Sequence, residues 1–405
     1  MSATAPLPDA QAAERLLTAG AVRARCEIVY RAAERGETRH FRLVPERLGA
    51  IAERVAAVTR RRHPDLDVPF HSRWRHFATG GIDRAALVAP GADPAETARA
   101  RLDLAFVSVL LDAGAGSAWT YREAETGMVL SRSEGLGVAS LRAMQAGLFS
   151  GDPAVPWRAD AAALAALTAA ALGQTFQHGS DNELAGLDGR VALLRRLGQA
   201  IAGMPEIFGS PARPGNLYDH WLARRGRLGA PDMLGLVLRA LGPIWPGRLS
   251  LGGVPLGDCG RHGAVPSDGL VPFHKLSQWL VYSLVEPLQE TGFHITRLDG
   301  LTGLAEYRNG GLLLDGGALA PRDPALWSRR LDAFSEEVVE WRALTVALLD
   351  RLAPLVRASL GKTEAEFPLL RLLEGGTWAA GRDIAAERRH DGGPPLNIVS
   401  DGTLF

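Results

Sequence analysis

The stretch VPFHKLSQWLVYSLVEPLQE, residues 271–290, repeats leucine every fourth position, at Leu276, Leu280, Leu284 and Leu288. Side chains four residues apart lie on one face of an α-helix, so this spacing predicts an amphipathic helix over 273–290. Similar helical patterns occur over 9–35, 44–61, 95–113, 187–202 and 331–356. Strand and helix patterns do not alternate along the chain. We therefore expect a mainly α fold with a few short strands, rather than a doubly wound sheet.

The composition is that of a globular protein with a large core. Hydrophobic residues make up 46% of the 405 residues, which excludes disorder over most of the chain. The 45 Lys and Arg residues balance the 45 Asp and Glu residues, so the net charge is zero. Zero charge argues against a general nucleic-acid binder and against a polybasic membrane anchor. No apolar run is long enough for a membrane helix, and the first residues do not have the pattern of a secretory signal, so we expect a cytoplasmic protein.

Motifs of the common enzyme classes are absent from the sequence. GLGVAS at 135–140 lacks the third glycine of a dinucleotide loop, and neither GxxxxGK[ST] nor GxSxG occurs. Cys26 and Cys259 form no metal-type spacing and no disulfide framework. His71 and His76 are five residues apart, which would splay them on a helix, so we expect no metal. Any chemistry must come from a less common set of residues.

Polar side chains share one face of the helix expected over 273–290. Lys275, Gln278 and Tyr282 stand at positions i, i+3 and i+7. One interpretation is a solvated face beside the leucine stripe. The other is the wall of a binding site, in which the Lys275 ammonium is a point charge for phosphate.

The segment DGLTGLAEYRNGGLLLD, residues 299–315, alternates polar residues with glycine and leucine. One interpretation is a polar connection that contains an arginine–carboxylate pair. The other is a carboxylate held where a helix meets a loop, with Arg308 and Asn309 as hydrogen-bond donors. Composition does not choose between them. The polar residues are Asp299, Glu306, Tyr307, Arg308, Asn309 and Asp315.

Several strings, which together cover most of the chain, resemble the uracil-catabolism protein 4 family, a domain family without an assigned function. The resemblance implies a role after the pyrimidine ring has been opened. The strings are SEGLGVASLRAMQAGLFS (133–150), HGSDNELAGLDGRVALLRRLG (178–198), RPGNLYDHW (213–221), VPFHKLSQWLVYSLVEPL (271–288), LTGLAEYRNGGLLLD (301–315) and VVEWRALTV (338–346).

The queuosine-nucleotide N-glycohydrolases carry similar strings in the same order. This more distant resemblance implies a helical fold like that of DNA glycosylases, and cleavage of a ribose–base N-glycosidic bond without a metal. The matching positions are Asp112 at a helix end, Val271, Phe273, Lys275 and Gln278 in a V-x-F-x-K-x-x-Q helix, LTGLAEYR at 301–308, and Glu340 and Arg342 in an E-x-R helix.

This sequence departs from the queuosine pattern at three places. Glu306 replaces an aspartate, Asn309 and Gly310 replace a Pro-Gln pair, and only Trp119 remains of an aromatic cluster. A pocket for a large deazapurine is therefore not expected, which fits a smaller leaving group.

Together the resemblances imply an N-glycohydrolase without a cofactor that cleaves ribosylurea, or its 5-phosphate, into urea and ribose or ribose 5-phosphate. The alternative is a non-catalytic nucleotide-binding protein or an assembly partner of the pyrimidine ring-opening enzyme. We expect a monomer or homodimer with a single large helical domain that binds neither nucleic acid nor membrane. Its parts are an N-terminal extension over 1–94, a glycosylase-like core over 95–358 and a C-terminal tail over 359–405.

The implied site has one central carboxylate and three kinds of supporting residue. Glu306 stabilises the oxocarbenium-like transition state or activates water. The supporting residues are Asp112, Asp299 and His274 as proton donors to urea, Lys275, Arg308, Gln278, Asn309, Tyr307 and Trp119 as substrate-binding or pocket residues, and Glu340 and Arg342 as an ion pair behind the site.

Overall fold

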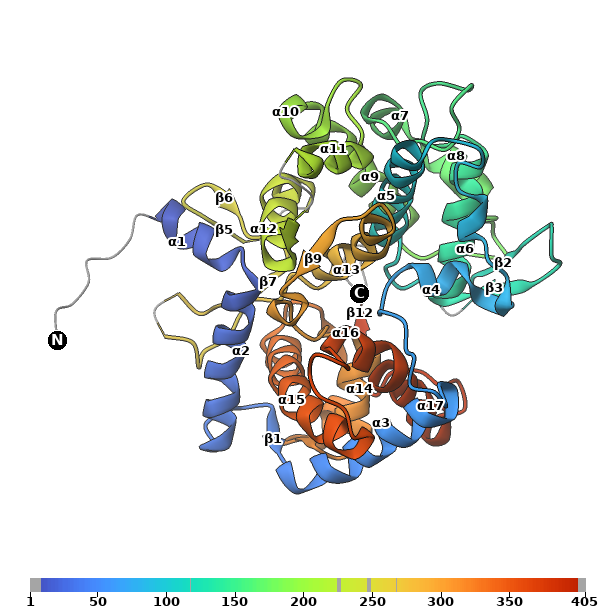
Figure 1. The fold of residues 1–405 in the computed structure, drawn as a ribbon. Coiled ribbons are helices and arrows are strands. Elements are labelled where there is room, and N and C mark those ends of the chain that lie inside the picture. The colour runs from blue at the N-terminus through green and yellow to red at the C-terminus, as the bar shows by residue number, and fades with distance from the viewer. Residues whose placement is uncertain (1–8, 117, 224–226, 246–248, 267, 400–405) are drawn as a thin grey trace. The chain divides into compact units, whose positions relative to one another are not determined.

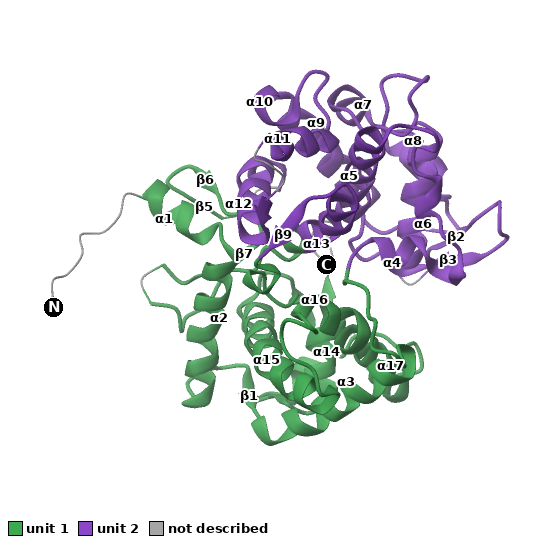
Figure 2. Cartoon of the chain, viewed as in Figure 1, with its two compact units in different colours: residues 1–71, 247–278, 297–399 green, residues 72–246, 279–296, 400–405 purple. Residues whose placement is uncertain are grey.

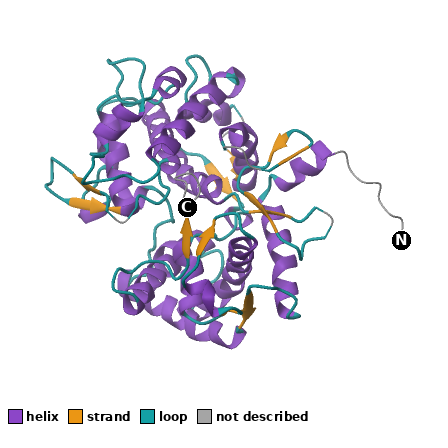
Figure 3. Ribbon diagram, turned by 180° about the vertical axis from the view of Figure 1, so that it is seen from behind, coloured by secondary structure: helices purple, strands orange, loops and turns teal. Residues whose placement is uncertain are grey.

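The computed structural model describes residues 9–116, 118–223, 227–245, 249–266 and 268–399 (Figure 1). Helices make up most of this part of the chain, and its strands are two or three residues long and paired two by two (Figure 3). The mainly α fold expected from the sequence is therefore confirmed. None of the helices among these residues is both long enough and apolar enough to cross a membrane.

The chain groups into two compact units, each assembled from segments that are far apart in sequence (Figure 2). Unit 1 comprises residues 1–71, 247–278 and 297–399, and unit 2 comprises 72–246, 279–296 and 400–405. The boundary falls inside helix α13 (Lys275–Glu290). The described part of unit 1 takes residues from all three of the ranges expected from the sequence, and that of unit 2 takes residues from the first two.

Unit 1 is built around one long helix. α15 (Glu336–Leu360) is buried over most of its length and packs against α2 (Ala19–Glu34), α3 (Leu48–Arg62) and α14 (Tyr307–Asp315). α14 in turn packs against α17 (Trp378–Arg388). The remaining elements are α1 (Asp9–Leu16), α16 (Leu369–Leu372), the antiparallel pairs β1 (Phe41–Leu43) with β10 (Leu319–Pro321), β5 (Ser250–Leu251) with β6 (Val254–Pro255) and β7 (Cys259–Arg261) with β8 (Leu270–Pro272), and the parallel pair β11 (Arg330–Asp332) with β12 (Asn397–Val399).

Unit 2 has the apolar helix α5 (Pro94–Leu110) in its core. The helix begins where the Asp93 side chain accepts the N–H of Glu96 at 2.9 Å, with Pro94 at its first position. The other elements are α4 (Trp74–Phe77), α6 (Arg132–Gln145), α7 (Ala161–Ala166), α8 (Ala169–Thr175), α9 (Leu187–Ala202), α10 (Pro205–Phe208), α11 (Leu217–Leu222), α12 (Ala230–Leu241), the hairpin β2 (Thr120–Arg122) with β3 (Val129–Ser131), and the parallel pair β4 (Arg227–Gly229) with β9 (His294–Thr296).

A buried arginine closes the carboxyl end of α5. The Arg190 guanidinium is fully buried and donates to the carbonyl oxygens of Ala113 and Gly114, each at 2.8 Å, and to that of Leu111. Burial lowers the pKa of Arg190 to about 10, which still leaves it charged at neutral pH. A cation is favourable here because the last carbonyls of a helix carry partial negative charge.

Helix α6 begins at Arg132, and the Ser133 hydroxyl in its first turn donates to Asp112 at 3.2 Å. Gly381 lies inside α17. The glycine is needed because a Cβ there would overlap the Arg308 carbonyl group of α14.

A second close approach explains Gly310 inside α14. A Cβ on Gly310 would overlap the Trp341 ring of α15, whose Nε1–H donates to the Gly310 carbonyl oxygen at 3.3 Å. The Gly-rich segment is therefore a helix on which two other helices pack closely.

Both cysteines are free and buried. Burial raises the pKa of the Cys26 thiol strongly and that of Cys259 to about 12. A thiol that stays protonated is a poor nucleophile, so neither cysteine is suited to covalent catalysis.

We expect Gly381→Ala to lower the free energy of unfolding by about 1–3 kcal/mol, because the new methyl group overpacks the α14–α17 contact. Alanine gains about 1 kcal/mol of helix propensity, which offsets only part of this loss. Urea denaturation measures the difference from the parent protein.

The matched control is Gly49→Ala in α3, where a Cβ would meet nothing within 4 Å. This substitution is expected to be stabilising by up to about 1 kcal/mol. A change of the same sign at both positions would rule out overpacking as the cause.

Candidate functional site

Glu306 lies at the junction between an irregular segment and α14. Its carboxylate accepts the backbone N–H groups of Arg308 at 2.7 Å and Asn309 at 2.6 Å, so it caps the helix. The residue is 9% exposed. An ionised carboxylate has about four acceptor positions, so two remain for a water molecule or a sugar hydroxyl.

The residues after Glu306 hold this junction in place. The buried Asn309 amide donates to the Leu304 carbonyl oxygen at 3.1 Å, across the turn that precedes Glu306. Arg308 donates to the Gly392 carbonyl oxygen at 2.9 Å. Tyr307 and Arg308 are half-buried in the first turn of α14.

A buried ion pair joins the neighbouring segments. The Arg342 guanidinium of α15 donates to both carboxylate oxygens of Asp258, at 2.7 and 2.8 Å. Its Nε–H faces the carbonyl oxygen of Ala305, immediately before Glu306, at 3.4 Å. Its carbon Cζ lies 4.0 Å from the centre of the Phe273 ring. Arg342 therefore contacts three separate parts of unit 1.

Asp258 also begins helix α13. Its Oδ2 accepts the backbone N–H of Lys275 at 3.0 Å. Burial works to raise the pKa of Asp258, but the charge and hydrogen bonds of Arg342 outweigh it and lower the pKa to about 2. The carboxylate is thus ionised at neutral pH.

The polar residues at the start of α13 are buried. Lys275 is 8% exposed, and Gln278 and Tyr282 are 1% and 0% exposed, which excludes a solvated face. The Gln278 amide donates to Thr302 Oγ1 at 2.7 Å and accepts the Thr302 N–H at 2.8 Å. Gln278 therefore joins α13 by hydrogen bonds to Thr302, in the segment that precedes Glu306.

His274 takes a left-handed backbone conformation, with φ of 51°. Its Nε2 lies 2.9 Å from the carbonyl oxygen of Leu16, so this nitrogen carries the proton and donates it. Burial lowers the pKa of His274. The imidazole is therefore neutral at pH 7.

Glu340 and Arg342 each have a buried partner of their own. Glu340 accepts the backbone N–H of Phe41 at 2.7 Å and lies 3.1 Å from His262 Nε2. It holds strand β1, whereas Arg342 holds Asp258.

Two of the remaining candidates belong to unit 2. Asp112 belongs to unit 2, where its carboxylate accepts from Arg73 Nη1 at 2.5 Å. Trp119, also in unit 2, is fully buried and donates to the Phe176 carbonyl oxygen at 2.9 Å. Asp299 belongs to unit 1 but is exposed, and the described residues provide no hydrogen-bond partner for it.

The sequence interpretation missed Asp258 and Arg73. Asp258 lies in an irregular stretch and is 84 residues from Arg342, so no local spacing connects the two. Arg73 lies in HSRWRHF (71–77), where clustered basic residues around an aromatic residue were the only signal.

Comparison with known proteins shows which family the chain belongs to. The family model described as "Protein of unknown function (DUF1688)" matches residues 15–405. The chain is 38% identical to Protein urg3 of Schizosaccharomyces pombe over 96% of this chain and 98% of that protein. It is 36% identical to Uracil catabolism protein 4 of Lachancea kluyveri over 91% of this chain and 93% of that protein.

Acidification is expected to remove the stabilisation by Asp258 between about pH 4 and pH 2. The pKa of its carboxyl group is about 2 in the folded chain and about 3.9 in an unfolded one. The contribution is therefore fully present above pH 4, is lost as the pH falls through the folded value, and amounts to about 2–3 kcal/mol. Urea denaturation at pH steps from 6 to 2 measures it.

Asp258→Asn should flatten the dependence of unfolding free energy on pH in this window. It should also cost about 3–5 kcal/mol at pH 7, because Arg342 loses its buried counter-charge. The exposed control Asp299→Asn should change neither quantity appreciably. An unchanged pH slope in Asp258→Asn would contradict the assignment.

Proposed function

The chain belongs to the DUF1688 family, and on that basis we propose that it acts in uracil catabolism as an N-glycohydrolase. The substrate is ribosylurea or ribosylurea 5-phosphate, and the products are urea and ribose or ribose 5-phosphate. The relative named Uracil catabolism protein 4 supports the pathway, since the alignment covers nearly the whole of both chains. The reaction itself is supported by the geometry around Glu306.

The observation that carries the proposal is the fixed, little-exposed carboxylate of Glu306. Cleavage of an N-glycosidic bond builds positive charge on C1 and the ring oxygen of ribose. A carboxylate that two backbone N–H groups hold in one orientation stabilises that charge without reorganising, or accepts a proton from the attacking water. Glu306 takes this role in the proposal.

Substrate binding falls to the two cations at the nearby helix starts. Lys275 is the first residue of α13, and Arg308 lies in the first turn of α14. Backbone N–H groups at both helix starts already donate to Asp258 or Glu306, so the positive charge for a substrate comes from the side chains of Lys275 and Arg308. In our proposal, Lys275 and Arg308 hold the 5-phosphate or the ribose hydroxyls.

The leaving urea needs a proton or strong hydrogen bonds. His274 is poorly suited to this task, because its Nε2–H is committed to Leu16 and burial lowers its pKa. Of the two carboxylates, Asp299 belongs to unit 1 with Glu306 and remains the proposed donor, whereas Asp112 belongs to unit 2. Asp112 already accepts from Arg73 and Ser133, whereas Asp299 is exposed.

Glu306→Gln is expected to lower the rate of urea release by about 10²–10⁴-fold, because the amide carries no charge and accepts no proton. The folded structure should survive, since the amide oxygen still accepts a helix N–H, and the stability should fall by about 1 kcal/mol. The measurement is urea released from ribosylurea and, separately, from ribosylurea 5-phosphate.

Asp93→Asn is the matched control, because Asp93 also caps a helix and loses the same charge. It should share the small loss of stability but keep full activity. Full activity in Glu306→Gln would disprove the role of Glu306. If the folded parent protein released urea from neither compound, the glycohydrolase proposal would be wrong, and a nucleotide-binding or assembly role would be favoured.

A further inference from the structure

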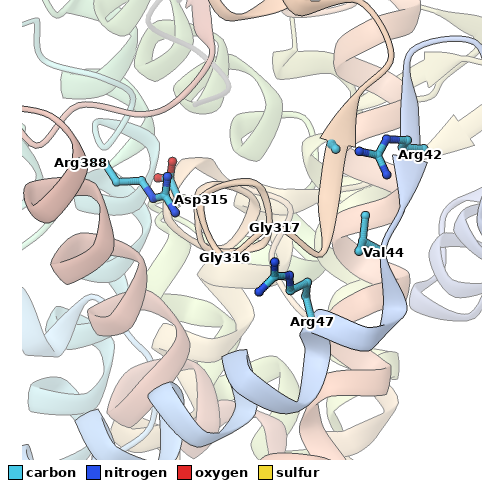
Figure 4. Close-up of a pocket in the computed structure, with 8 residues that line it drawn as sticks. Arg42, Val44, Arg47, Asp315, Gly316, Gly317 and Arg388 are labelled. Carbon is cyan, nitrogen blue, oxygen red and sulfur yellow. The ribbon is translucent and has the colours of Figure 1, made fainter.

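A pocket of about 340 Å³ lies at the end of α14 that is opposite Glu306 (Figure 4). It is lined by Arg42 and Val44 of the chain around β1, by Arg47, by the turn after α14, and by Arg388 at the end of α17. All of these residues belong to unit 1. The volume is in the range of small-molecule sites.

Three guanidinium groups surround this pocket without a carboxylate partner. Within the part of the chain that the structure describes, Arg42, Arg47 and Arg388 form no ion pair, and all three are exposed. Figure 4 shows Arg42 and Arg47 on one side and Arg388 on the other. Other exposed arginines of unit 1 do have carboxylate partners, such as Arg31 with Glu27 and Arg35 with Glu37. The pocket therefore carries an uncompensated positive charge.

The carboxylates nearest to these arginines already have other partners. Asp315, which lines the pocket, is bound by both terminal nitrogens of Arg389, one of them at 2.9 Å. Glu387, next to Arg388 in sequence, accepts from both terminal nitrogens of Arg54, at 2.8 and 2.9 Å. Arg388 acts on Glu387 only through its charge and forms no ion pair with it, so these two carboxylates do not balance the three arginines.

Gly316 and Gly317, which follow α14, line the pocket with backbone atoms only. Gly317 has φ of 80°, a backbone conformation that residues with a side chain rarely adopt. A Cβ built on Gly317 would lie 3.8 Å from Arg47 Cγ. The Arg47 side chain thus lies along the glycine, with its guanidinium at the pocket. The carboxyl end of α14 carries a partial negative charge of about half an elementary charge, which repels an anion. The three positive charges of the guanidinium groups exceed this partial charge.

We propose that this pocket binds a small phosphate-bearing anion, either inorganic phosphate or a phosphorylated sugar, at a site separate from Glu306. Planar guanidinium groups bind phosphate oxygens through paired N–H groups. The nine residues of α14 separate the two sites by about 13 Å. Because the arginines are exposed, binding weakens as the salt concentration rises.

The test is direct binding to the intact protein, measured by calorimetry at low ionic strength with inorganic phosphate and with ribose 5-phosphate. The double variant Arg42→Gln/Arg388→Gln should weaken binding of at least one of these ligands tenfold or more. Arg330→Gln, which changes an exposed arginine of unit 1 outside the pocket, should leave it unchanged.

The same titration with Arg308→Gln separates this pocket from the proposed substrate site. Binding that survives Arg308→Gln but is lost in the double variant supports the pocket, whether or not urea release is ever observed. The proposal is overturned if neither ligand binds, or if the double variant binds both as tightly as the parent protein.

Discussion

The buried pair of Asp258 and Arg342 is the constraint on which the arrangement of unit 1 depends. One guanidinium contacts the carboxylate that starts α13, the ring of Phe273 and the carbonyl group just before Glu306. Removing two charges from water is expensive, and the cost is recovered only with complete hydrogen bonding, which the two short N–H···O contacts supply. The candidate carboxylate is thus positioned by an ion pair that does not itself have to touch the substrate.

Buried arginines also join separate segments by hydrogen bonds elsewhere in the chain. Arg190 binds the carbonyl oxygens of the residues that follow α5, and the fully buried Arg73 binds Asp112. In unit 2, the buried Glu123 accepts from both Arg84 and Arg142. A planar fork with five donors satisfies several acceptors from one position, which the point charge of lysine does not. In this sequence of few lysines, buried arginines therefore join separate segments by hydrogen bonds.

The helices could be predicted because their apolar residues recur every three or four positions, as along α13 and α15. The sequence did not predict that the Gly-rich segment and Gly381 are helical, because glycine weakens an isolated helix. These glycines are explained only by the neighbouring elements that pack against them. Gln278 and Glu306 were singled out from the residue pattern and Arg342 through resemblance, and unit 1 brings their segments into contact. Asp258, Arg73 and the three pocket arginines come from separate parts of the chain, and no spacing along the sequence connects them.

The two inert cysteines have a practical consequence. Both thiols are buried and hold their protons, so neither should react with a maleimide under native conditions. A single cysteine introduced at an exposed position would then be the dominant reactive thiol of the chain. With two such cysteines, one on each unit, a donor and an acceptor dye could be attached without removing any native residue, and energy transfer between them would report how far apart the two units are in solution.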